Sequence, residues 1–291
     1  MLKSLIIVGL IMGSIYGLIG LGYSVIYRAS GIMNLAQGEL ITLSAFLGYT
    51  FFGVCGLPYG VALILTVVIM FAFGVLIQKG LVAKYQKRGV TGVYMLLITF
   101  GLSRVINGGE ALIFGSNAKR FPSIFNISTV NILGAHLQPE RIMCLFLALI
   151  SMLLVHLFMT KTKTGIGMQA CAMHSKAAEA CGIDVVKSNG LTWGLASVVA
   201  AMCGMMLGPI YGVTLLLGAN LSQMGFASSV AGGMGNIYGA MVGGIIIGLI
   251  ESLVGGYVNS TWKSMIAYLI LFLILAVRPT GLFNEQAVRD V

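Results

Sequence analysis

Nine long apolar runs, separated by short segments that hold most of the charges, constrain this chain more than any other feature of its sequence. A helix needs about 20 mostly apolar residues to cross the hydrocarbon core of a bilayer. The pattern therefore predicts a single all-α transmembrane domain over residues 1–291, a polytopic bundle of eight or nine spans, since the run at 215–232 has poorly marked ends. We place the runs at 4–27, 37–54, 58–78, 91–114, 141–160, 190–213, 215–232, 236–257 and 262–278.

The composition agrees with a membrane protein. The chain is 58% hydrophobic and only 9% charged, whereas a soluble domain normally carries about a quarter charged residues. The alternation of polar and apolar residues that is typical of outer-membrane barrels is absent from the sequence. The apolar run that follows Lys3 is too long for the core of a signal peptide, so we interpret it as the first span.

The net charge of +9 comes from basic loops. Cytoplasmic loops of membrane proteins collect Lys and Arg, and no basic patch interleaved with aromatic residues suggests nucleic-acid binding. The segments 79–90 and 161–189 are both basic and are separated by two spans, so we expect both on the cytoplasmic side. The segment 115–140 between them is then expected on the outer side, although it carries Lys119 and Arg120.

The sequence holds no recognisable catalytic or cofactor-binding constellation. The five cysteines and three histidines are scattered and form no metal-ligand spacing or disulfide framework. A phosphate-binding GxxxxGK[ST] loop is also missing from the sequence. We therefore predict no catalytic residue, no metal and no cofactor bound by this chain; if ATP and Mg drive its function, a partner subunit must bind them.

Glycines recur at four-residue spacing in two apolar runs. Small residues at this spacing let helix backbones approach closely in lipid, where no hydrophobic force draws helices together. The glycines expected to pack helices are Gly9, Gly13, Gly17, Gly235, Gly239 and Gly243.

Polar residues interrupt the apolar pattern between the first two runs. The stretch "GIMNLAQGELITLSAF" (31–46) sets Asn34, Gln37 and Glu39 between two spans. One interpretation is a broken helix that lines a substrate pathway or gate, because irregular backbone is tolerated in a membrane only where protein or water surrounds it. The other is an ordinary cytoplasmic turn, with Glu39 in the first turn of the next helix.

Three further charges, Arg104, Glu110 and Glu251, lie within apolar runs. A charge at bilayer depth normally faces protein or water. We expect structural partners for all three.

The segment "KTKTGIGMQACAMHSKAAEACGIDVVKSNG" (161–190) is the one long hydrophilic stretch. Ser175 suits an N-cap and Gly182 suits the position after a helix end, so a helix of about two turns is predicted between them. Such a helix is too short to be stable alone. It either docks into a groove of a partner protein or is a solvated connector. Its residues are Ser175, Lys176, Ala177, Ala178, Glu179, Ala180, Cys181 and Gly182.

This segment and two others resemble one known family. "TGIGMQACAMHSKAAEACGIDVVKSNGLTWGLASVVAAMCGMMLG" (164–208) is similar to the coupling segment of the permeases of branched-chain amino acid ABC importers, the LivH/LivM class. "GIMNLAQGE" (31–39) is similar to the family's Asn-x-Ala-x-Gly-Glu motif, and "GGMGNIYGAMVGGIIIGLIES…VRPTGLF" (232–283) follows its C-terminal pattern. The short N-terminus resembles the LivH-like subunit more than the LivM-like one. One departure is His174–Ser175, where many members carry Asp-Pro.

The resemblance implies a partner set and a substrate class. It implies a multi-pass subunit of the bacterial cytoplasmic (inner) membrane that forms a pore with a second, LivM-like permease. Two ATP-binding subunits would each receive the coupling helix within 161–189, and an extracytoplasmic solute-binding protein would deliver the cargo. The expected cargo is leucine, isoleucine or valine, passing a weak, mostly apolar channel. Urea, amides or other amino acids are alternatives within the family, and an ion-coupled secondary transporter is the alternative outside it.

Overall fold

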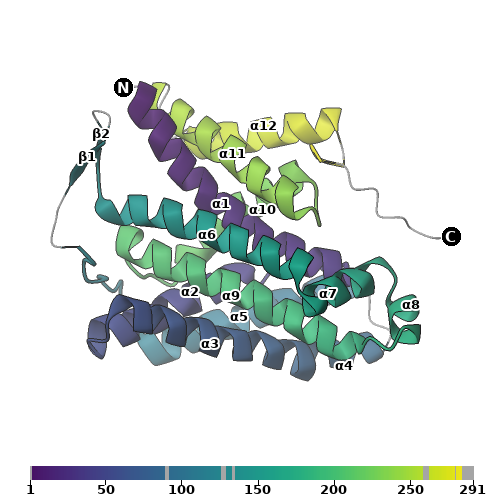
Figure 1. The fold of residues 1–291 in the computed structure, drawn as a ribbon. Helices are drawn as coiled ribbons and strands as arrows, with labels where there is room; N and C mark the ends of the chain where they lie inside the picture. The colour runs from purple at the N-terminus through teal and green to yellow at the C-terminus, as the bar shows by residue number, and fades with distance from the viewer. Residues whose placement is uncertain are drawn as a thin grey trace.

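The computed structural model describes residues 2–88, 92–125, 129–132, 135–257, 262–278 and 280–283, and most of these residues are helical (Figure 1). The segment from residue 284 onward and residues 89–91 of the first basic loop lie outside the described residues. The helices are α1 (Leu2–Ser30), α2 (Gln37–Gly48), α3 (Tyr59–Ile77), α4 (Ala83–Lys87), α5 (Val93–Phe114), α6 (Pro139–Lys161), α7 (Lys163–Met173), α8 (Ser175–Ala180), α9 (Val185–Tyr211), α10 (Leu217–Gly232), α11 (Ile237–Tyr257) and α12 (Lys263–Val277).

The predicted polytopic helical bundle is confirmed. Six helices of the described chain are long and apolar enough to cross a membrane: α1, α3 with its continuation to Gln86, α5, α6, α9 and α11. The predicted runs at 37–54, 215–232 and 262–278 also form helices, but α2, α10 and α12 are shorter. A π-helical segment (Tyr49–Val54) extends α2.

The two basic segments lie at the same end of the bundle, and the first, 79–90, is helical as far as Lys87 in the part that the structure describes. Figure 1 shows α4 and α8 at one end and the short strands β1 (Val130–Ile132) and β2 (Ala135–Leu137) at the opposite end. The strands pair antiparallel, with Val130 opposite Leu137. This arrangement is the one that the predicted topology requires, and which end faces the cytoplasm stays a prediction.

Helices α1 and α11 pack backbone to backbone. A Cβ added to Gly13 would lie 2.7 Å from the Cα of Ile245, and one added to Gly9 would lie 2.9 Å from the Cα of Leu249. From the other side, a Cβ on Gly244 would overlap the backbone of Gly17. Only glycine permits this approach, which brings long stretches of the two helices into van der Waals contact.

The second predicted glycine series divides between two roles. Gly239 and Gly243 lie against the α10 backbone at Gly232 and Ser228. Gly235 precedes α11 and has φ +89°, and a Cβ there would lie at ordinary contact distance from Tyr27 and Arg28 near the end of α1. Its left-handed backbone, which glycine adopts readily, makes it a turn residue instead.

Buried serines join the same helices by hydrogen bonds. The Ser228 hydroxyl lies 3.1 Å from the carbonyl oxygen of Tyr16 in α1 and 3.0 Å from that of Ala240 in α11. The hydroxyls of Ser24 and Ser229 are 2.7 Å apart. Polar side chains therefore link α1, α10 and α11 where glycine has brought their backbones together.

Replacing Gly244 with Ala should destabilise the bundle. The added methyl group would collide with backbone atoms of α1, which cannot move aside as a side chain can, and such overpacking costs about 1–3 kcal/mol. Gly60→Ala is the matched control, because a Cβ at Gly60 meets nothing within 4 Å. Thermal unfolding of the detergent-solubilised protein, followed by size-exclusion chromatography, measures the effect. Equal midpoints for the two variants would contradict the packing role of Gly244.

Candidate functional site

The polar break between α1 and α2 is an ordered turn. The chain leaves α1 through Gly31, which has φ +65°, and re-enters a helix at Gln37. The Asn34 side chain accepts a hydrogen bond from the backbone N–H of Ala36 (3.1 Å), and its amide donates to the Gln37 side chain (3.3 Å). Asn favours such local bonds to its own backbone.

The polar residues of this break are buried: Asn34 and Gln37 are at most 1% exposed, whereas Gly31 and Leu35 are exposed. The Gln37 amide donates to the carbonyl oxygen of Ala196 in α9 (3.2 Å) and packs against Gly22 of α1. Gly22 lies eight residues before the end of α1 at Ser30, and Ala196 lies eleven residues after the start of α9 at Val185. At 1.5 Å per residue, these distances are about 12 and 16 Å along the two helices. The break therefore lies deeper than the ends of α1 and α9, and its role in lining a pathway or gate stays a prediction.

A second helix begins at the same depth. The Gly38 carbonyl touches Gly218 in the first turn of α10, and the backbone N–H of Gly218 donates to the Thr42 hydroxyl (3.0 Å). The first turns of α2 and α10 therefore meet inside the bundle. Helix N-termini carry partial positive charge, so this meeting point is suited to acidic and polar groups.

Glu39 connects this meeting point to α5. Its carboxylate is 5% exposed and accepts a hydrogen bond from the Asn107 amide (3.1 Å). The same amide donates to the carbonyl oxygen of Leu215, just before α10 (3.1 Å). Sequence reasoning missed Asn107, although a lone Asn in the apolar run 91–114 was the signal that could have found it.

The other intramembrane charges have different environments. Glu110 is 1% exposed, lies close enough to Glu39 for their charges to interact, and has no hydrogen-bond partner among the described residues. Arg104 is exposed, and its guanidinium lies 5.0 Å from the centre of the Phe100 ring. Glu251 is buried beside Tyr16 and does not reach the surface.

The predicted loop helix is present as α8, with a different N-cap. His174, not Ser175, caps it: the His174 backbone is extended, and its Nδ1 accepts a hydrogen bond from the backbone N–H of Ala177 (3.1 Å). Ser175 is the first helical residue, because the imidazole already accepts the bond that its hydroxyl would have taken. Gly182 has φ +83° and ends the helix as predicted, with its N–H donating to the Glu179 carbonyl (2.9 Å).

One residue of α8 is buried. Ala178 is 4% exposed, and its carbonyl oxygen accepts a hydrogen bond from the backbone N–H of Ile183 (3.0 Å). Ala178 is therefore a contact within this chain and cannot face a partner protein. The remaining residues of the predicted coupling helix are exposed: Ser175, Lys176, Ala177, Glu179, Ala180, Cys181 and Gly182.

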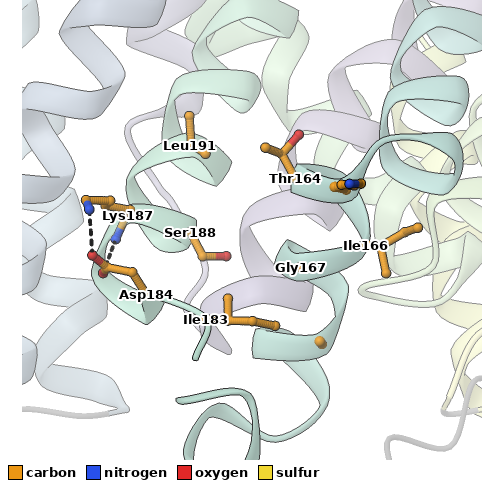
Figure 2. A pocket seen from close by; sticks show the side chains of 10 residues that line it. Thr164, Ile166, Gly167, Ile183, Asp184, Lys187, Ser188 and Leu191 are labelled. Atoms are coloured by element: carbon orange, nitrogen blue, oxygen red, sulfur yellow. Dashed lines mark hydrogen bonds and ion pairs between the residues drawn. The ribbon is translucent and has the colours of Figure 1, made fainter. Parts of the chain in front are cut away.

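A groove of about 480 Å³ lies between α7 and the start of α9, the two helices that flank α8 in the sequence (Figure 2). Its walls include the apolar side chains of Ile166, Ile183 and Leu191. Asp184 caps α9 by accepting a hydrogen bond from the backbone N–H of Lys187 (3.0 Å), and the two side chains form an ion pair (3.2 Å). The backbone hydrogen bond from Lys187 lowers the pKa of Asp184 below its ordinary value.

Helix α7 was not foreseen, because the sequence offers little apolar periodicity there. It begins after Thr162, whose hydroxyl accepts a hydrogen bond from the backbone N–H of Gly165 (3.0 Å). Gly165 lies against the backbone of Met159, and the Gln169 amide donates to the carbonyl of the same residue (2.6 Å). These contacts hold the loop segment 161–189 against the end of α6.

Known proteins resemble the whole chain. A model of the family described as branched-chain amino acid transport system / permease component matches residues 5–275. The permease protein LivH of the high-affinity branched-chain amino acid transport system of Escherichia coli K12 is 28% identical over 97% of this chain and 96% of its own length. The corresponding permease protein BraD of Pseudomonas aeruginosa is also 28% identical, with the same coverage.

A solved structure with lower sequence identity has a similar fold. PsaBC from Streptococcus pneumoniae, in complex with Fab, matches with a TM-score of 0.51 and 11% identity, over 96% of this chain and 92% of that chain. The family model covers all but a few residues at each end of the described bundle. This chain belongs to the family of permease components of branched-chain amino acid transport systems.

Proposed function

We propose that this chain is a pore-forming subunit of an ATP-driven importer for branched-chain amino acids in the bacterial cytoplasmic membrane. The observation that carries the proposal is the family match over residues 5–275, together with relatives that are named high-affinity branched-chain amino acid transport permeases. The six long apolar helices and the polar break inside the bundle agree with a transport role. Leucine, isoleucine and valine are the proposed cargo.

The energy source lies outside this chain in the proposal. The sequence has no phosphate-binding loop of the Walker type, so two partner subunits would bind ATP and Mg. A solute-binding protein would deliver the cargo, and a second permease, LivM-like in the heterodimeric case, would complete the pore. An ion-coupled transporter is less well supported, because no relay of bonded carboxylates joins Glu39, Glu110 and Glu251 in the described part of the chain.

Helix α8 and the groove between α7 and α9 are the proposed docking surface for an ATP-binding subunit. The helix exposes small side chains such as Ala177, while Ala178 holds it on the bundle. In the proposal, a displacement of α8 would move the start of α9, because α8 ends at Ala180 and α9 begins at Val185. The interface would include apolar contact at Ile166, which is 54% exposed.

The proposed function is tested by reconstituted transport. Proteoliposomes holding this chain, its second permease and the two ATP-binding subunits should accumulate leucine when the binding protein and MgATP are supplied. ADP in place of ATP is the control. Uptake of urea without leucine would contradict the proposed cargo, and leucine uptake driven by an ion gradient without ATP would contradict the proposed energy source.

Ala177→Arg should uncouple the assembled transporter. The long charged side chain would project from the exposed face of α8 into the ATP-binding subunit, while Ala178 keeps the helix on the bundle. We expect a fall in ATP-driven uptake of about tenfold, which corresponds to about 1.4 kcal/mol of lost coupling. Ala177→Ser is the matched control and should transport normally. Normal uptake by the Arg variant, with intact assembly, would contradict docking through this face.

A further inference from the structure

Arg104 occupies a position that lipid cannot explain. It lies eleven residues after the start of α5 at Val93 and ten before its end at Phe114, so it is at the middle of a span. An Arg at the centre of a bilayer costs about 2.5–3.5 kcal/mol on insertion scales, and such residues face protein or water. The face of α5 that carries Arg104 is therefore expected to lie against protein or water and not against lipid.

The space around Arg104 is open. Gly101 and Gly108 lie about one turn to either side of it, and a Cβ at either glycine would meet nothing within 4 Å. The side chain of Val105, the next residue along α5, is 72% exposed. Within the described residues the guanidinium contacts the Phe100 ring and forms no ion pair. Its five N–H donors are available to a ligand.

A negative charge lies near the same face. The Glu39 carboxylate accepts a hydrogen bond from the Asn107 amide (3.1 Å), and Asn107 lies about one helical turn after Arg104 in α5. Behind them, Glu110 is buried, and neither of its oxygens has a hydrogen-bond partner among the described residues. This part of the bundle thus holds one positive group, Arg104, and two negative groups, Glu39 and Glu110. Asn107 lies between Arg104 and Glu110 in the sequence of α5.

We infer that this face of α5 lines the water-filled translocation pathway, and that Arg104 binds the carboxylate of the passing amino acid while Glu39 attracts its ammonium group. The inference rests on the proposed function. It replaces the expected mostly apolar channel with one that has charged residues near its middle. A planar guanidinium matches a carboxylate in a two-point contact. One exposed Arg binds weakly, which suits a site that must release its cargo quickly.

Cysteine accessibility tests whether the face is wet. Arg104→Cys is made in a cysteine-free chain within the complete transporter in nanodiscs, and the negatively charged thiol reagent MTSES is added. The control is Ile150→Cys, at a position eleven residues from each end of α6 where the native side chain is 51% exposed. Only the thiolate reacts, so the thiol introduced at position 104 should be modified at least about tenfold faster than the thiol introduced at position 150. Equal, slow modification at both positions, whether from lipid or from a tightly packed partner subunit, would overturn the inference.

Protection by ligand tests the carboxylate contact. In a chain that keeps Arg104, a reporter at Gly108→Cys should be modified more slowly in the presence of leucine, whereas leucinamide, which lacks the carboxylate, should give little protection. Arg104→Gln should abolish the protection by leucine, and Arg104→Lys should retain part of it. Equal protection by leucine and leucinamide would overturn the role of Arg104. ATP-dependent uptake by the wild-type transporter is measured separately, so failure here is distinguishable from failure of the proposed function.

Discussion

The close contact between α1 and α11 is the interaction on which the rest of this structure depends. In lipid, apolar side chains gain nothing by leaving one apolar surrounding for another, so helices associate through dense packing and hydrogen bonds. Gly13 and Gly244 let the two backbones touch, and α1 then contacts α6, α9 and α10 along its length. With α1 at the centre, serine hydroxyls such as that of Ser228 reach carbonyl groups on neighbouring helices. A larger residue at these glycines would separate the helices and break those bonds together.

That packing explains how a polar break survives inside an apolar bundle. Glycine recurs where α2 and α10 begin, at Gly38 and Gly218, and it lets the two first turns meet. Each polar group there finds a partner in the surrounding helices: Gln37 bonds to α9, Thr42 to α10 and Glu39 to α5. Irregular backbone at this depth is stable only when its polar groups are satisfied in this way. The same arrangement places Glu39 beside the α5 face that carries Arg104.

Hydrophobic length located the spans, and it could do so because each crossing needs a long apolar run. The residues at the break were also predictable, since polar groups stand out in such runs. Three features were not predictable. The half-buried start of α10 depends on Gly38, far away in the sequence. The capping role of His174 depends on its extended backbone, and Ser175 was the better candidate by residue type. The inward orientation of Ala178 depends on how α8 lies on the bundle. Each is set by tertiary contacts.

The depth of the polar break in the membrane is the most direct test of a broken helix at the centre of the bundle. Electron cryomicroscopy of the assembled transporter in a lipid nanodisc, at a resolution that shows side chains, measures this depth. We expect the backbones of Gly38 and Gly218 to touch near the middle of the disc, with the Glu39 carboxylate bonded to Asn107 at that level. A Glu39 carboxylate at the level of the lipid headgroups, with α2 beginning at the membrane surface, would contradict the broken helix.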